Sequence, residues 1–175
     1  MTNDFAIPVL GFAAWSGTGK TTLLSQVLPI LREAGLRCAL VKHAHHDFDI
    51  DHPGKDSYEL RKAGAGQVLI ASRRRWALMV EREHEQDPPL AELLRHLDPT
   101  QADLVLVEGF KHERLPKIEL HRPTLGRPLL YPDDPDVIAV ASDRPLDVPL
   151  PRLDLNDPAS IAAFVVEFHR AHTAR

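Results

Sequence analysis

Residues 14–22 read AWSGTGKTT and match the P-loop pattern G-x-x-x-x-G-K-[ST] except at its first position, which is Ala14. An apolar run typical of a buried strand, Ile7–Ala13, precedes this loop. Apolar residues at helical spacing follow it: Leu23, Leu24, Val27, Leu28 and Leu31. A strand, a glycine-rich loop and a helix in this order are the context that a P-loop needs. The stretch therefore predicts a phosphate-binding loop, and we expect Ala14 to keep a negative φ because alanine avoids positive values.

A P-loop holds phosphate oxygens with its backbone N–H groups and with the partial positive charge of the helix behind it. Lys20 would reach the β- and γ-phosphates as a catalytic residue, and the Thr21 hydroxyl would bind Mg²⁺. The nucleotide-binding residues predicted in this loop are Ser16, Gly17, Thr18, Gly19, Lys20, Thr21 and Thr22.

A second candidate position lies at the end of Asp103–Glu108, where an unbroken apolar run predicts a strand buried on both faces. Ligands of open α/β sheets bind beyond the carboxyl ends of the strands, where the P-loop also opens. Glu108 is therefore a candidate catalytic residue and Mg²⁺ ligand, directly or through a water, opposite Thr21. Gly109 would let the backbone approach the γ-phosphate. A solvated acid followed by an ordinary turn is the alternative.

Two further acidic residues are candidates for ligand binding. Asp143 follows the apolar run Val137–Ala141, and its carboxylate could accept hydrogen bonds from the N1–H and amino group of guanine, a donor pair that adenine lacks. A turn residue before a proline is the alternative. Asp49 lies in the acidic loop Asp47–Asp51 and could swing toward Mg²⁺ as part of a switch loop, or the loop could simply be solvated.

Alternating strand and helix patterns predict an α/β fold of the P-loop NTPase type, with a mainly parallel sheet flanked by helices. We expect a single nucleotide-binding domain over residues 1–175 that ends in a helix at about 157–172. Eight of the fifteen prolines lie between Pro116 and Pro151, which predicts loops and short edge strands there.

The middle of the chain predicts an insertion into this sheet. Two strand-like runs, Gln67–Ala71 and Trp76–Val80, indicate a β-hairpin within about 66–80. Before it, Asp56 followed by Glu59 resembles a capping box at the start of a short helix whose Leu60 would face inward.

Composition narrows the functional classes. A net charge of −4 argues against a general nucleic-acid-binding protein, which would carry a basic surplus. No apolar stretch approaches the about 18 residues that a membrane helix needs, so we expect no membrane partner. Cys38 is the single cysteine, which excludes an intramolecular disulfide and suits the reducing cytoplasm.

Several separate motifs together resemble one family. They are the P-loop with Lys42-His43, the block PGKDSYELRKAG at 53–64, EGFK at 108–111 and AVASD at 139–143. In this combination and order they resemble the MobB family, the molybdopterin-guanine dinucleotide biosynthesis adaptor proteins. The resemblance covers about Pro8 to Phe168 and is poorest between Arg122 and Asp136, where no family feature is carried over.

The resemblance implies a homodimer that binds GTP with Mg²⁺ and has weak GTPase activity. Its implied partners are the molybdenum cofactor guanylyltransferase and, for delivery of the finished cofactor, molybdoenzyme apoproteins. It also favours Asp143 as the guanine-selecting residue. A self-sufficient ATP-dependent kinase or ligase of small-molecule biosynthesis is the alternative on the same fold, and clear ATP selectivity would identify it. A binding adaptor that never hydrolyses its nucleotide is a third possibility.

Overall fold

The computed structural model describes residues 5–44, 48–83 and 86–173 and divides the chain into two compact units. One unit combines residues 1–43 with 89–175, and the other comprises residues 44–88. Each unit contains one β-sheet. No helix among the described residues is long and apolar enough to cross a membrane.

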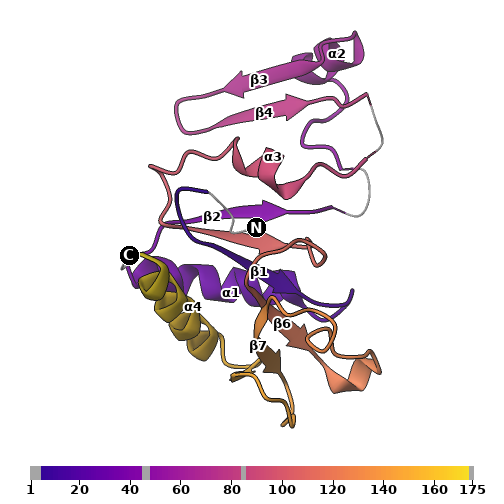
Figure 1. The fold of residues 1–175 in the computed structure, drawn as a ribbon. Coiled ribbons are helices and arrows are strands. Elements are labelled where there is room, and N and C mark those ends of the chain that lie inside the picture. Colours follow the sequence, from indigo (N-terminus) through magenta and orange to yellow (C-terminus); the bar gives the residue numbers. More distant parts are fainter. Residues whose placement is uncertain (1–4, 45–47, 84–85, 174–175) are drawn as a thin grey trace. The chain divides into compact units, whose positions relative to one another are not determined.

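The larger unit is built on a six-stranded sheet of order β2-β5-β1-β6-β7-β8, in which every neighbouring pair runs parallel (Figure 1). Its strands are β1 Val9–Ala13, β2 Cys38–Lys42, β5 Leu104–Glu108, β6 Lys117–His121, β7 Val137–Ser142 and β8 Arg152–Asp154. β1 and β5 are buried along their whole length because both have strand neighbours on each side and packed layers on each face. The predicted α/β class with a parallel sheet is confirmed.

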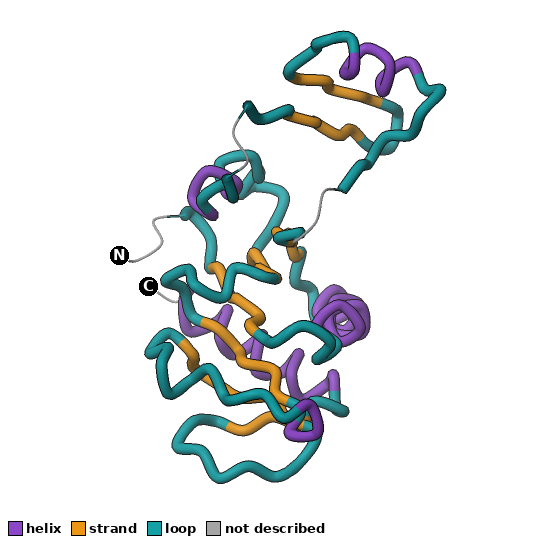
Figure 2. Tube along the Cα trace, turned by 90° about the vertical axis from the view of Figure 1, so that its right-hand side faces the viewer, coloured by secondary structure: helices purple, strands orange, loops and turns teal. Residues whose placement is uncertain are grey.

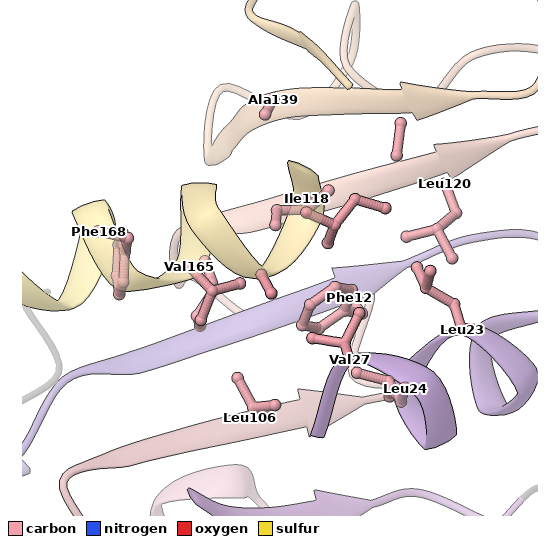
Figure 3. Close-up of a cluster of buried hydrophobic side chains, with 14 of the residues drawn as sticks. Phe12, Leu23, Leu24, Val27, Leu106, Ile118, Leu120, Ala139, Val165 and Phe168 are labelled. Carbon is pink, nitrogen blue, oxygen red and sulfur yellow. The ribbon is translucent and has the colours of Figure 1, made fainter. Parts of the chain in front are cut away.

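Two long helices, α1 Lys20–Glu33 and α4 Pro158–Thr173, pack on one face of this sheet. Figure 3 shows side chains of both helices meeting those of the strands in one apolar core. The residues that it labels are Phe12, Leu23, Leu24, Val27, Leu106, Ile118, Leu120, Ala139, Val165 and Phe168. The opposite face carries a second apolar cluster that includes the short helix α3, Leu90–Leu94. A single 3₁₀ turn, η1 Pro123–Leu125, follows β6.

The smaller unit contains a two-stranded antiparallel sheet, β3 Gln67–Ala71 and β4 Trp76–Val80, next to α2 Asp56–Lys62 (Figures 1 and 2). The two hairpin strands have the predicted bounds. The predicted cap of α2 is wrong, because the N-cap residue is Lys55 and Glu59 instead accepts a hydrogen bond from the Gly54 N–H. Leu60 does not face inward either, since α2 has no buried residue.

The proline-rich region departs from the prediction of edge strands. β6 lies inside the sheet, between β1 and β7, and all five of its residues are buried. Pro116 and Pro123 flank the strand without entering it, so no ladder hydrogen bond is lost. β6 was not recognised as a buried strand because every second residue is polar. Lys117, Glu119 and His121 lie on one face of the strand and are all buried.

These buried polar groups hold the next loop on the sheet. Glu119 accepts hydrogen bonds from the backbone N–H groups of Leu130 and Tyr131 at 2.7 and 2.9 Å. Burial raises the pKa of Glu119 despite these two donors. Lys117 Nζ lies 2.5 Å from a carboxylate oxygen of Asp134. The buried charges of Glu119 and Lys117 therefore hold the loop between β6 and β7 against the sheet.

A further ion pair joins the start of β2 to the start of β5. Arg37 Nη2 lies 2.7 Å from Oδ1 of Asp103, and the backbone N–H of Arg37 donates to the same carboxylate at 2.9 Å. These hydrogen bonds lower the pKa of Asp103 to about 2. The carboxylate form of Asp103 therefore stabilises the folded chain.

Replacing Asp103 by asparagine should destabilise the protein at neutral pH by about 1 kcal/mol, since the Arg37 side chain is 56% exposed and water screens the pair. A carboxyl with a lowered folded-state pKa stabilises above its unfolded pKa of about 3.9, and this stability is lost as the pH falls toward 2. The difference between variant and wild type should thus shrink across this window. Urea denaturation on both sides of it measures the effect, and a pH-independent difference would contradict the assignment.

Candidate nucleotide-binding site

The loop between β1 and α1 has the backbone geometry of an anion-binding cradle. Gly17 and Gly19 have φ angles of 82° and 98°, which only glycine adopts readily, and no non-glycine residue described has a positive φ. Ala14 therefore keeps the negative φ predicted for it. Within the described part of the chain, no acceptor binds the backbone N–H groups of Gly17, Gly19 or Lys20. These donors are available to a phosphate at the start of α1.

The other predicted loop residues occupy two environments. Ser16, Thr21 and Thr22 are exposed to solvent, where a ligand could reach them. Thr18 is buried, and its hydroxyl donates to the Trp15 carbonyl at 2.7 Å. The Thr18 side chain thus stabilises the loop itself.

Lys20 is the first residue of α1, and its side chain reaches back to the start of the P-loop. Its Nζ donates to the Ala14 carbonyl at 3.3 Å, a long hydrogen bond that a phosphate could replace. Burial lowers the pKa of Lys20; Glu108 opposes this shift, while Lys42 and Lys111 add to it. A bound phosphate would favour the ammonium form.

The structure brings together Thr21 and Glu108, two of the three residues predicted as candidates to hold Mg²⁺. The Thr21 hydroxyl donates to Oε1 of Glu108 at 3.1 Å. Glu108 ends β5, which pairs with β1, the strand that leads into the loop. A hydroxyl and a carboxylate at one sheet edge are hard oxygen donors, so these residues fit Mg²⁺.

Lys42 lies next to Thr21 and Glu108 and was not predicted as a functional residue. Its Nζ lies 3.1 Å from Thr21 Oγ1 and 3.5 Å from Glu108 Oε2. Lys42 ends β2 directly opposite Glu108 in the parallel register. That alignment of adjacent strand ends is a signal that sequence analysis could have used, because parallel strands end at the same edge.

Gly109 has a local structural reason to be glycine. Its φ is 96°, and a Cβ added there would lie 2.9 Å from the Cβ of His43. The ring of His43 in turn lies 5.3 Å from that of Phe110. Packing against His43 is therefore one reason for a glycine at position 109. The predicted close approach of Gly109 to a γ-phosphate stays a prediction.

Asp143 lies just beyond β7, at the same sheet edge as the P-loop. Its Oδ2 accepts a hydrogen bond from Arg122 Nη1 at 2.7 Å, and Arg122 Nε donates to the Thr18 carbonyl at 2.9 Å. Oδ1 of Asp143 is buried without a hydrogen-bond partner among the described residues. A cavity of about 390 Å³ opens here, lined by residues of β7, β8 and the loop between them.

Arg122 thus links the predicted base-recognition residue to the predicted phosphate loop. It was missed because it lies in the segment 122–136, where the motifs carry no family feature. The sequence carries no usable signal for it, since Arg122 directly follows β6, the neighbour of both β1 and β7, and β6 itself was not predicted.

Asp49 belongs to the smaller unit, where its carboxylate forms an ion pair with Arg61 at 2.6 Å. Hydrogen bonding to Arg61 lowers the pKa of Asp49. Asp47, the first residue of the acidic loop, lies outside the described residues. A role for Asp49 in metal binding stays a prediction.

The parallel sheet and the glycine-rich loop between β1 and α1 define the chain as a P-loop NTPase-like protein. Over residues 9–143 it matches the family "Molybdopterin guanine dinucleotide synthesis protein B", and it belongs to this family. The resemblance read from the motifs is thereby confirmed.

Relatives match the chain over almost its whole length. It is 54% identical over 169 residues to the molybdopterin-guanine dinucleotide biosynthesis adapter protein of Escherichia coli (strain K12). This match covers 96% of the present chain and 97% of the relative. The corresponding adapter protein of Haemophilus influenzae is 43% identical over 170 residues, with 97% and 94% covered. A crystal structure of molybdopterin-guanine biosynthesis protein B has a TM-score of 0.71 at 29% identity, with 93% and 99% covered.

Proposed function

We propose that this chain is a GTP-binding accessory protein of molybdopterin-guanine dinucleotide biosynthesis. It would act in the cytoplasm, bind GTP with Mg²⁺, hydrolyse it weakly and assist the guanylyltransferase that makes the dinucleotide. The adapter proteins of E. coli and H. influenzae support the pathway. The observation that carries the nucleotide assignment is the gathering of Lys20, Thr21 and Glu108 at one sheet edge.

In the proposed complex, the free N–H groups of the P-loop and the Lys20 ammonium hold the phosphates. Mg²⁺, when bound, would neutralise phosphate charge. Thr21 and Glu108 would hold the metal, and Glu108 would also orient a water. Asp143 would accept the guanine N1–H and amino hydrogens, with its unpartnered Oδ1 as one acceptor.

Phosphate release in the presence and absence of the guanylyltransferase tests the hydrolytic part of this proposal. Slow release from the chain alone supports weak GTPase activity. No release in either condition would select the adaptor that never hydrolyses its nucleotide. Fast release from ATP that depends on a small-molecule substrate would favour the kinase or ligase.

We also propose that the chain forms a homodimer through the hairpin. Leu69, Trp76, Leu78 and Val80 share one face of the two-stranded sheet, because residues paired across the strands and two apart along them point the same way. Their exposed fractions are 63%, 66%, 38% and 46%. Such a contiguous apolar face, with strand edges beside it, favours pairing with a second copy.

Replacing Leu69 by glutamate should shift a dimer toward monomer, because it would bury a charge in the apolar contact. Sedimentation velocity of the full chain measures the effect. Leu125→Glu is the matched control, since Leu125 is also exposed, at 42%, but lies outside the hairpin. A monomeric wild-type chain, or equal effects of the two substitutions, would contradict this interface.

A further inference from the structure

A second cavity, of about 450 Å³, opens on the Trp15 side of the P-loop and has no part in the site described above. Its walls come from the loop that follows β5, the start of β6 and the loop between β6 and β7. The volume is within the range of small-molecule sites. Trp15, a P-loop residue, forms one wall.

Trp15 is a fixed aromatic surface. Its indole Nε1 donates to the Pro128 carbonyl at 2.8 Å, which anchors the ring although it is only partly buried. Lys111 Nζ lies 4.8 Å from the ring centre, and the Arg127 guanidinium lies 5.6 Å from it. An anchored tryptophan in the cavity wall with the Lys111 ammonium over its ring favours a ligand that combines a flat ring with negative charge.

Lys117, a buried residue of the cavity lining, holds neighbouring parts of the wall in place. Lys117 is 2% exposed, and its ammonium donates to the Lys111 carbonyl at 3.1 Å while pairing with Asp134. This fixes the backbone of Lys111. The Lys111 ammonium lies over the indole ring. Among the residues that the structure describes, the ion pairs of this region join Lys117 to Asp134 and Arg114 to Asp136 and do not include Lys111.

The cavity adjoins the phosphate end of the predicted nucleotide site. Trp15 lies in the short loop that leads into α1, and Lys20 is the first residue of that helix. A ligand in the cavity and a triphosphate on the P-loop would therefore lie next to each other.

We propose that this cavity binds a second small ligand, a flat heteroaromatic ring that carries an anionic group, as in a pterin phosphate. The ring stacks on Trp15 in place of the Lys111 ammonium, which turns aside to contact the anionic group. Asp133, exposed in the cavity wall, accepts ring N–H groups of the kind found in pterins. The choice of a pterin over other rings rests on the proposed function, because it takes the ligand class from the pathway.

Tryptophan fluorescence of the full-length chain tests this inference. The background variant Trp76→Phe leaves Trp15 as the sole tryptophan, since the chain has two. Titration with 6-carboxypterin should quench Trp15 emission saturably, beyond the quenching of free N-acetyltryptophanamide. Lys111→Ala should weaken this binding at least tenfold, whereas Arg95→Ala, which removes an exposed cation after α3, should leave it within twofold.

Two further measurements, titration with GMP and pterin binding by Lys20→Ala, distinguish the possible ligands and their sites. If GMP quenches as strongly as the pterin and competes with it, the cavity is a second nucleotide site and the pterin assignment is overturned. Loss of pterin binding in Lys20→Ala would place the ligand on the P-loop instead, and unsaturable quenching or an unchanged affinity in Lys111→Ala would remove the site. GTP binding is measured separately by calorimetry. Its absence alongside intact pterin binding would refute the proposed function and leave the cavity site standing.

Discussion

Replacement of Lys20 by alanine should weaken GTP binding by about 100-fold or more, equivalent to about 2.7 kcal/mol, while the protein stays folded. An ammonium contributes charge-assisted hydrogen bonds to phosphate that alanine cannot replace. Among the described residues the Lys20 ammonium makes one hydrogen bond, a long one of 3.3 Å to a loop carbonyl, so folding loses little. Alanine also suits the first position of α1.

Calorimetric titration with GTP and Mg²⁺ measures this loss, and circular dichroism with thermal unfolding checks the fold. Lys62→Ala is the matched control, because Lys62 is an exposed helical lysine in the other unit. A GTP affinity of Lys20→Ala equal to that of the control would refute the phosphate-binding role of the loop.

Asp143→Asn should weaken GTP binding at least tenfold and leave ATP binding almost unchanged. Asparagine keeps the shape of aspartate, but its NH₂ group can only donate, so one of the two acceptors for guanine is lost. The ion pair with Arg122 is lost as well, which gives a measurable fall in thermal stability. The separation of GTP from ATP, rather than a general loss of affinity, is the signature of base recognition.

Asp147→Asn is the control for this second substitution, since Asp147 is an exposed acid a few residues further along the same loop. Equal losses of GTP and ATP affinity in Asp143→Asn would assign the residue to loop stability. No loss of either would make it a plain turn residue.

The central part of the site was predictable because its signals are local or follow from strand ends. The spacing of residues 14–22 fixes the P-loop without knowledge of the rest of the chain. The pairing of Glu108 with Thr21 followed from one further step, that the carboxyl ends of parallel strands share an edge. The hairpin was found from its two strand-like runs, and Ser72 supplies the turn by accepting hydrogen bonds at Oγ from Arg74 and Arg75.

The parts that were missed depend on partners far away in the sequence. β6 carries Lys117 and Glu119 in the interior, which an apolar pattern cannot identify as buried. Their burial is tolerable only because Asp134 and the backbone near residue 130 provide the matching groups. Arg122 was missed for the same reason, since its contacts with Thr18 and Asp143 join three separate loops.

The short helix α2 illustrates a different limit. Asp56 and Glu59 have the spacing of a capping box, but several residues in this stretch could begin a helix. The chain uses Lys55 as the N-cap, with an extended backbone and no side-chain hydrogen bond. Element bounds therefore remained less predictable than the elements themselves.

Calorimetric titration of the purified wild-type chain with GTP and with ATP, each with Mg²⁺, tests the central claim most directly. The expected result is that GTP binds at least tenfold more tightly, a difference of about 1.4 kcal/mol, because Asp143 accepts two hydrogen bonds that only guanine offers. Equal affinities, or tighter binding of ATP, would contradict the guanine-specific site and favour the ATP-dependent enzyme on the same fold.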